Sequence, residues 1–400
     1  MATITLDVPA LFPQQRQIAD CNTRFVAAAC GRRFGKTEAG KRRILRAALA
    51  GQTAWWLSPT YQMATGVWRD LKSMLRPIRP HVREVDRTLE LINGGSIAVR
   101  STAAHDNLRG AGLDFAVLDE AAFMHPDVWP QIVRPMLLER SGGALFLSTP
   151  NGRNWFFDVY QRGVSGDDPE WRAFHFTSFD SPLVPAGEYD RLRAMTPERV
   201  FAEEYLAEFM DTSGSVFRFI REAAVAEPGQ QPLASHVYVM GVDWGRENDF
   251  TAIAVFDVTT SSLVALDRFN QVGWSLQRGR LAALAATWKP TVILAEANSI
   301  GAPNIEALQA EGLPVEAFTT TMQTKRAVIE ALALALEQQR IRILNDETLL
   351  SEMMSFEQQR LPGGAIRYGA RSGAHDDTVM ALALAWHAAG RQPAWRAFLV

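Results

Sequence analysis

Carboxylates that follow apolar runs are the side chains of this 400-residue sequence best suited to chemistry. The acids concerned are Asp119, Glu120, Asp243, Glu296, Asp376 and Asp377. Strand ends in an α/β sheet meet at one edge, and hard carboxylate oxygens suit Mg²⁺ or Mn²⁺. The spacing along the chain therefore predicts two separate acidic sites, one early and one late.

A phosphate-binding loop precedes the early pair. It lies between an apolar run and a helical pattern, and Gly31 and Gly35 permit the tight turn of N–H groups that it needs. Lys36 would reach the outer phosphates of ATP, and Thr37 would offer a hydroxyl to Mg²⁺. Cys30 stands where the strict pattern has glycine, so the loop alone does not decide the matter. The predicted ATP-binding residues of the loop are Gly31, Arg32, Arg33, Phe34, Gly35, Lys36 and Thr37.

The early acids complement this loop. Asp119 is expected to hold the water shell of the magnesium ion, and Glu120 to orient or deprotonate the attacking water. The next apolar run ends in Ser148, Thr149 and Pro150, whose hydroxyls could sense the γ-phosphate and couple hydrolysis to movement.

The late acids predict a nuclease centre. Asp243 and Glu296 end strand-like runs, and Asp376 and Asp377 open a helical pattern. Two Mg²⁺ or Mn²⁺ ions held roughly 4 Å apart by such groups can activate water and stabilise the leaving oxygen of a phosphodiester. Taken without the other acids, Asp376 and Asp377 would be interpreted as the N-cap and first turn of a helix. Asp249 is a second-tier candidate for the same site.

Apolar periodicity gives the elements that must position these side chains. Residues 25–149 alternate strand and helix patterns, as in a largely parallel α/β sheet, whereas residues 238–269 read as an antiparallel meander. The expected strands are Phe25–Ala29, Thr53–Leu57, Phe115–Leu118, Ala144–Leu147, Tyr238–Val242, Thr251–Asp257, Leu263–Phe269, Val292–Ala295 and Ile341–Leu344, with an inserted hairpin of Leu89–Ile92 and Ser96–Arg100. The expected helices are Glu198–Met210, Met322–Gln338 and Asp376–Ala389.

Length and composition bound the class of protein. Four hundred residues with 47% hydrophobic content predict two domains and a connecting piece. Two cysteines, no membrane-length apolar run and no export pattern at residues 1–13 predict a soluble intracellular protein. The net charge of −3 does not exclude nucleic-acid binding, because positive charge is concentrated at residues 32–46. The run from Lys41 to Arg46 is equally well interpreted as a solvated helix face.

The combination of motifs resembles the large terminase subunit of tailed double-stranded DNA bacteriophages, over nearly the whole chain from Pro13 to Asp377. The resemblance implies an N-terminal P-loop ATPase of the additional-strand, RecA/helicase-like class at residues 1–180. It implies a lid and linker at 181–232, with the boundary at Pro228–Pro232, and a ribonuclease H-like nuclease at 233–400.

The resemblance also implies roles for single residues. Gln15 is similar to the family's adenine-contacting glutamine, and Arg109 to its arginine finger, which completes a neighbouring subunit's site. Arg32 could do the same work in cis, so the two arginines stay alternatives. Glu120 matches the family's ATPase acid, and Asp243, Glu296, Asp376 and Asp377 match its nuclease acids.

The implied function is a DNA-packaging motor in the cytoplasm of an infected bacterium. Its expected cofactors are ATP with Mg²⁺ and two Mg²⁺ or Mn²⁺ ions for the nuclease. Its expected partners are double-stranded DNA, the portal and procapsid, the small terminase subunit, and further copies of itself. The copies are expected to form a ring when docked on the portal, whereas the isolated chain is expected to be a monomer. No membrane is expected. A helicase-nuclease of recombination or repair, and a non-catalytic capsid-vertex assembly protein, are the alternatives.

Overall fold

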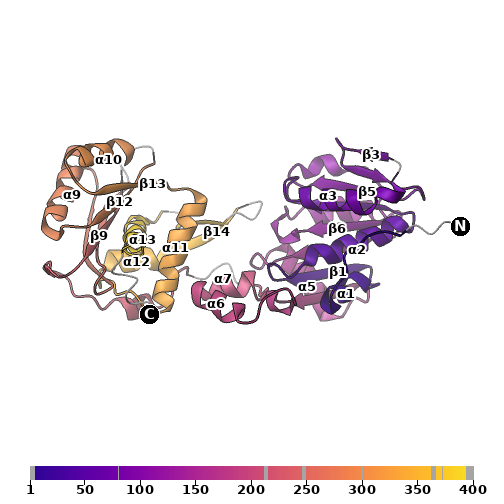
Figure 1. Ribbon diagram of the computed structural model, residues 1–400, viewed down its shortest axis with the longest axis horizontal. Helices are drawn as coiled ribbons and strands as arrows, with labels where there is room; N and C mark the ends of the chain where they lie inside the picture. The colour runs from indigo at the N-terminus through magenta and orange to yellow at the C-terminus, as the bar shows by residue number, and fades with distance from the viewer. Residues whose placement is uncertain are drawn as a thin grey trace. The chain divides into compact units, whose positions relative to one another are not determined.

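The computed structural model describes residues 5–79, 81–210, 215–245, 249–298, 301–361, 366–371 and 373–392. These residues form two compact units, one built chiefly from residues 5–194 and 199–210 and the other chiefly from residues 215–360 and 366–392. The two units carry different sheets (Figure 1). None of the described helices combines the length and the apolar character needed to cross a membrane.

The first unit is built on an eight-stranded sheet. Its strands are β1 (Phe25–Cys30), β2 (Thr53–Ser58), β3 (His81–Arg83), β4 (Thr88–Glu90), β5 (Ser96–Ser101), β6 (Phe115–Asp119), β7 (Gly143–Ser148) and β8 (Trp171–Phe176). They lie in the order β3-β4-β5-β2-β6-β7-β1-β8. From β5 to β8 all neighbours are parallel, and β3 and β4 add an antiparallel edge.

The parallel sheet and its four main strands are therefore confirmed. The expected hairpin is only partly right. Its two strands do pair antiparallel, but the first ends at Glu90, and the second, β5, also pairs in parallel with β2. The hairpin is thus the continuation of the main sheet and not an insertion beside it.

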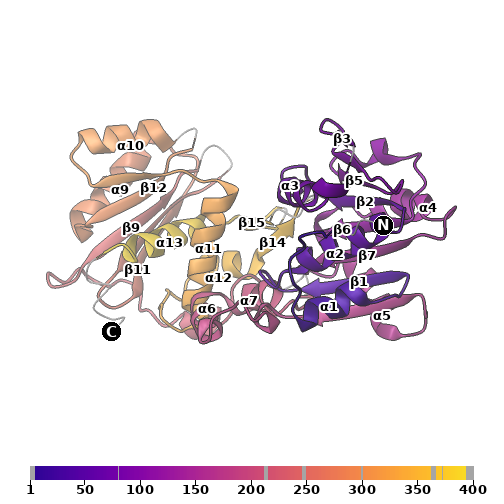
Figure 2. The ribbon, with the colours of Figure 1, turned by 45° about the vertical axis from the view of Figure 1, so that its right-hand side comes forward.

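Helices cover both faces of this sheet (Figure 2). The α-helices are α1 (Pro13–Asp20), α2 (Lys36–Leu49), α3 (Thr65–Met74), α4 (Arg134–Met136), α5 (Trp155–Ser165), α6 (Glu188–Met195) and α7 (Glu198–Glu204). The short 3-10 or π segments are η1 (Arg76–Ile78), η2 (His105–Leu108), η3 (Ala121–Phe123), η4 (Val128–Val133) and η5 (Ser178–Asp180). One hydrophobic core forms under α1, α2 and α3, and a second under α5 and η4.

Two local features shape this unit around its strand ends. A side chain on Gly40 would meet Leu147 at 2.7 Å and Trp56 at 2.9 Å, so the glycine lets α2 pack directly on the sheet. The expected helix Glu198–Met210 is wrong beyond Glu204, where α7 ends. The chain then turns, and Tyr205 accepts a backbone hydrogen bond from Ser178.

The second unit has a five-stranded sheet in the order β11-β10-β9-β12-β13 and a separate two-stranded hairpin. Its strands are β9 (Tyr238–Asp243), β10 (Thr251–Asp257), β11 (Ser262–Phe269), β12 (Val292–Glu296), β13 (Val315–Phe318), β14 (Phe356–Arg360) and β15 (Ile366–Ala370). Its helices are α8 (Ile220–Ala223), α9 (Trp274–Trp288), α10 (Gly301–Ala310), α11 (Met322–Glu337), α12 (Glu347–Ser355) and α13 (Asp377–Ala389).

The expected meander is confirmed, because β10 pairs antiparallel with both β9 and β11. The strand expected at Ile341–Leu344 is wrong: its residues make only isolated bridges, from Arg342 to Ser262 and from Leu344 to Ala226. Its apolar side chains are buried in the core as an irregular segment, so burial without a partner strand produced the strand-like pattern. β13 and the β14–β15 hairpin were not anticipated.

Close packing of α13 on β9 positions the late acids. Gly241, in the middle of β9, has no room for a side chain: a Cβ there would lie 2.1 Å from the carbonyl oxygen of Ala381 and 2.4 Å from the amide of Ala385. The helix is apolar on all sides and almost wholly buried, as a central core helix must be. Its N-terminal residue Asp377 is therefore fixed relative to Asp243 at the end of β9.

Two candidate active sites

The loop between β1 and α2 has the form of a phosphate cradle. Arg33 (φ 62°) and Gly35 (φ 91°) adopt left-handed conformations, and Gly35 is the N-cap of α2. Such a turn directs successive N–H groups outward at a helix N-terminus, where the helix dipole favours an anion. Gly31 is packed too tightly for any side chain, since a Cβ would lie 2.4 Å from the carbonyl oxygen of Tyr205.

Lys36 stands at the centre of this site and is almost fully buried. Its Nζ lies 3.0 Å from Oε1 of Glu120 and donates to Oγ1 of Thr149 at 3.4 Å. Burial lowers the pKa of Lys36, but the charges of Glu120 and Asp119 outweigh that effect and leave the pKa above its ordinary value. The ammonium is therefore charged, and it joins the β1 loop, the end of β6 and the end of β7.

The acids at the end of β6 have oxygen atoms without partners. Oδ1 of Asp119 and Oε2 of Glu120 are buried and accept no hydrogen bond in the described structure. Burial, and then the neighbouring charge of Glu120, raise the pKa of Asp119 to about 7. Two unsatisfied carboxylate oxygens beside a phosphate cradle fit a hard cation such as Mg²⁺, whose charge would compensate both.

A cavity of about 1040 Å³ opens over the loop. Polar groups of the loop line one part of it, together with Glu120 and Thr149. The part contributed by residues 178–192 is more apolar and includes Phe179, Leu183 and Val184. Its volume and mixed lining suit a nucleotide, with phosphates on the loop and a base near the apolar wall. The apolar wall was not anticipated from the sequence, because its residues lie about 150 positions from the loop.

Gln15 and Phe34 hold the loop in place through contacts with its neighbours. Nε2 of Gln15 donates to the carbonyl oxygen of Gly35 at 3.0 Å, and its Oε1 accepts from the amide of Phe12. The Phe34 ring stacks on Phe176 with centroids 5.0 Å apart. Gln15 is thus placed beside the loop, with its amide satisfied by backbone groups in this structure.

The two candidate arginines have different surroundings. Arg32 forms a two-pronged pair with the carboxylate of Glu204, and that hydrogen bond is the main cause of its raised pKa. Arg109 has a side chain 57% exposed, with a 3.5 Å contact to Asp106. Arg32 lines the cavity and Arg109 does not. Glu204 was not anticipated as a partner.

The end of β7 contacts the segment that follows Glu120. Oγ of Ser148 accepts from the amide of Ala122 at 3.1 Å, and Nδ2 of Asn151 donates to the carbonyl oxygen of the same residue. Because Thr149 faces Lys36, a change at the phosphates can reach both strand ends through these contacts.

The late site forms where β9 and β12 end side by side. The two strands are parallel neighbours, with Val242 opposite Ala295, so Asp243 and Glu296 emerge together. The pKa of Asp243 is raised well above its usual range. The largest cause is burial of the carboxyl away from water, followed by a hydrogen bond with Glu296 and by the charges of Glu296, Asp377 and Asp376. Carboxyls gathered in this way fit a cation site, where the charge of a metal ion would offset their mutual repulsion.

The helix acids lie further out. Asp377 is buried, its Oδ2 has no hydrogen-bond partner, and burial followed by the charge of Glu352 raises its pKa to about 6. Asp376 forms an ion pair with Lys325 at 2.8 Å. Within the described residues, no three acids at this sheet edge have carboxylate oxygens all within 4.8 Å of one another. The structure thus joins Asp243 to Glu296 and places Asp377 within range of their charge. The side chain of Asp249 is exposed.

Glu352 and Arg268 support the late site and were not anticipated. Glu352 accepts from the amide and the hydroxyl of Thr378, in the first turn of α13, and its Oε1 lies 3.0 Å from Nη2 of Arg268. The same Nη2 lies 3.8 Å from Oδ2 of Asp377, and the guanidinium covers the ring of Phe250. The only signal that the sequence offered was a glutamate, Glu352, within the largely apolar run 349–354.

Two family models and several relatives match this chain. Residues 28–224 match the family model described as "Terminase large subunit, T4likevirus-type, N-terminal", and residues 240–389 match the "Terminase RNaseH-like domain". The terminase large subunit of Thermus virus P23-45 is 30% identical over 410 residues, covering 90% of this chain and 83% of that protein. The corresponding protein of Thermus phage G20c is also 30% identical, with the same coverage.

Two solved structures also match parts or most of this chain. A large terminase from a thermophilic bacteriophage has a TM-score of 0.58 at 16% identity, covering 93% of this chain and 97% of that chain. The large terminase nuclease from phage G20c, solved with bound magnesium, is 29% identical over 44% of this chain and 97% of that chain, with a TM-score of 0.41.

Proposed function

Because the chain belongs to the family of terminase large subunits, we propose that it is the motor that uses ATP to move double-stranded DNA into a procapsid and the nuclease that cuts the DNA. The observation that supports this most directly is the presence of two acidic sites with unsatisfied carboxylate oxygens, one in each unit. The family membership favours this function over a repair helicase-nuclease and over a non-catalytic assembly protein.

In the first unit, Lys36 and the N–H groups of residues 31–37 hold the phosphates of ATP. Thr37 and Asp119 are the residues that would hold Mg²⁺, which neutralises charge on the outer phosphates. Glu120 lies at the phosphate end of the cavity and orients the attacking water, taking its proton as the bond to the γ-phosphate breaks. Release of the Lys36–Glu120 pair by the incoming phosphates frees that carboxylate to do so.

In the second unit, Asp243, Glu296 and Asp377 would hold Mg²⁺ or Mn²⁺, with Asp376 and Asp249 as further candidates. The ions would supply activated water and stabilise the leaving oxygen of the phosphodiester. The chain's own contribution is to collect the carboxylates at one sheet edge. Glu352 fixes the start of α13, and Arg268 keeps positive charge beside Asp377.

The finer parts of the proposal concern partners. The exposure of Arg109, and its absence from the cavity lining, suit an arginine that acts on the site of a neighbouring copy in a ring. The ring would dock on the portal of the procapsid, in the cytoplasm of the infected host, and a small terminase subunit would select the DNA. Residues 181–232 would act as lid and linker, since residues 183–192 form the apolar wall over the nucleotide.

Encapsidation of DNA is the direct test. The full-length chain, procapsids bearing the portal, linear duplex DNA and ATP would be mixed, and DNA protected from added nuclease would be measured. Protection that requires hydrolysable ATP and is lost in Glu120→Gln supports the motor. ATP turnover without any protected DNA, under conditions where a related motor packages, would contradict it.

A further inference from the structure

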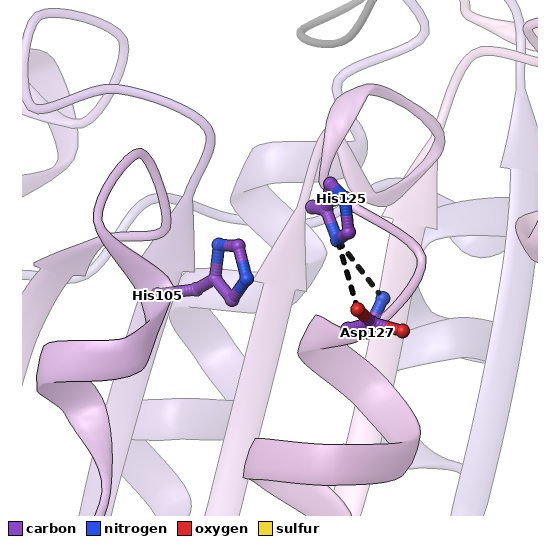
Figure 3. A group of neighbouring side chains, drawn as sticks. All are labelled: His105, His125 and Asp127. Atoms are coloured by element: carbon purple, nitrogen blue, oxygen red, sulfur yellow. Dashed lines mark hydrogen bonds and ion pairs between the residues drawn. The ribbon is translucent and has the colours of Figure 1, made fainter.

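Three metal-ligating side chains gather in the first unit, and none of them lines the cavity over the phosphate loop. His105 opens η2, His125 follows η3, and Asp127 immediately precedes η4. One ligand atom from each lies within 4.8 Å of the other two, and no other trio of His, Cys, Asp or Glu among the described residues meets this condition. Figure 3 shows His105 directed from one segment toward His125 and Asp127 on another.

We propose that His105, His125 and Asp127 form a binding site for a divalent transition-metal ion of the zinc type. Two imidazoles and one carboxylate are a donor set for Zn²⁺, Co²⁺ or Ni²⁺, whereas Mg²⁺ prefers oxygen ligands alone. The site therefore selects a different class of ion from that of the two acidic sites. Its fourth position would be left to water or to an external ligand.

The distances already suit part of this site. Nδ1 of His125 and Oδ2 of Asp127 are 3.6 Å apart. Two ligands bound at about 2.1 Å in a tetrahedral site lie roughly 3.4 Å from each other, so these two atoms need almost no movement. The amide of Asp127 now donates to the same Nδ1 at 3.3 Å, a long hydrogen bond that the ion would replace.

His105 supplies the third ligand after a change of ring orientation. The rings of His105 and His125 are stacked, with centroids 4.8 Å apart and planes inclined by 13°. Stacked rings do not aim their nitrogens at one point, so one imidazole must turn about its Cβ–Cγ bond. That torsion is broad for histidine, and His105 is only partly buried, so its ring can turn while the His125–Asp127 pair stays in place.

The site would join two segments that the backbone does not connect closely. His105 lies four residues before Arg109, and His125 lies five residues after Glu120. A bound ion would fix η2 and the Arg109 loop against the segment that leaves the ATPase acids. The metal site itself does not depend on the role proposed for Arg109.

Metal titration of the untagged full-length chain tests the proposal. Co²⁺ and then Zn²⁺ would be titrated in excess Mg²⁺, which occupies the carboxylate sites but competes poorly for imidazole. The expected result is one Mg²⁺-resistant equivalent of Co²⁺ with visible absorption, displaced by Zn²⁺. His105→Ala and His125→Ala should each weaken that binding by about tenfold or more. His81→Ala, which removes an exposed histidine from β3 of the same unit, should leave it unchanged.

A second measurement needs no variant. Zn²⁺ should protect His105 and His125, but not His81, from acylation by diethyl pyrocarbonate, as mapped by mass spectrometry. The proposal is overturned if the wild-type chain binds no equivalent that resists Mg²⁺. It is equally overturned if the Mg²⁺-resistant equivalent persists unchanged in His105→Ala and His125→Ala, or if Zn²⁺ protects all three histidines of the wild-type chain alike.

Discussion

The ammonium of Lys36 lies 3.0 Å from the carboxylate of Glu120, so the residue proposed to hold the phosphates and the residue proposed to orient the attacking water neutralise each other. This pair holds the site together before nucleotide binds, since both groups are largely removed from water. Phosphate oxygens that enter the loop compete with Glu120 for the same cation. With the proposed roles, ATP binding would therefore release the Glu120 carboxylate from Lys36.

Lys36→Met should abolish ATP hydrolysis and also weaken the first unit. Removing one partner of a largely buried ion pair leaves Glu120 and Asp119 without a cation, at a cost of about 3 kcal/mol. Lys41→Met is a matched control on the same helix, because Lys41 is also buried and pairs with Glu38 and Asp70 but does not line the cavity. Both variants should melt earlier, and the control should retain ATP turnover. Equal turnover in the two would show that Lys36 has no special role.

Glu120→Gln and Asp243→Asn should separate the two activities. The first should lower ATP turnover at least about a hundredfold, because the amide cannot accept the proton of the attacking water, and should leave plasmid cutting in Mn²⁺ intact. The second should stop cutting and spare ATP turnover. Asp267→Asn is the control for the nuclease and should leave cutting unchanged. Asp267 lies on β11 and forms an ion pair with Arg280 on α9. If Glu120→Gln loses cutting and keeps turnover, the roles are assigned to the wrong units.

Asp119 makes the metal-free protein less stable as the pH rises. Its folded pKa of about 7 lies above the unfolded value near 3.8, so the folded state holds the extra proton between them. This stability is fully present below the unfolded pKa and is lost as the pH rises through about 7. Its size is on the order of 4 kcal/mol.

Asp119→Asn should therefore raise the melting temperature in EDTA at pH 8, have little effect at pH 4, and abolish ATP turnover. Adding Mg²⁺ should stabilise the wild-type chain at pH 8 more than the variant. The prediction is contradicted if the wild-type melting temperature in EDTA stays flat or rises between pH 4 and pH 8 and Asp119→Asn does not change it. The buried charge of Asp119 would then not control stability in this pH range.

The strand-end acids could be placed from the sequence because a simple rule governs them. Asp243 and Glu296 each follow an apolar run, and parallel neighbours bring such residues to one edge. The pairs that support the sites follow no such rule. Arg32 and Glu204 are 172 positions apart, and Lys325 meets Asp376 across 51. Their contact depends on tertiary packing, which local pattern does not encode.

Burial explains the errors in the same terms. Ile341–Leu344 has the composition of a strand, but no neighbouring edge accepts it as one, so only isolated bridges form. The sequence after Glu204 keeps an apolar pattern, but the chain turns there, and backbone groups of Arg32 and Ser178 bond to Glu204 and Tyr205. In both places tertiary contacts overrode the local preference.

Mixing of variant subunits should distinguish Arg109 from Arg32. If Arg109 acts on a neighbour, Arg109→Ala alone should lose about a thousandfold in ATP turnover of the assembled ring. Mixing it with Lys36→Met, also inactive, should restore turnover, because the second subunit supplies a working arginine to the first one's intact site. Arg32→Ala mixed in the same way should stay inactive at its own sites, since its Glu204 partner and cavity lie in the same chain. Restoration by Arg32→Ala and not by Arg109→Ala would reverse the assignment.

Glu352→Gln should weaken metal binding by the nuclease without changing the fold. The amide oxygen can still accept from the Thr378 amide, so the start of α13 stays in place, but the charge that holds Arg268 is gone. Arg268 would then turn fully to Asp377, whose Oδ2 is only 3.8 Å away, and compete with the metal ion. The Mn²⁺ concentration for half-maximal cutting should rise about tenfold, with ATP turnover unchanged. Glu347→Gln, on the same helix, is the control. Since a purely structural role would lower the melting temperature and leave the Mn²⁺ requirement as it is, that combination would exclude Glu352 as a positioning residue.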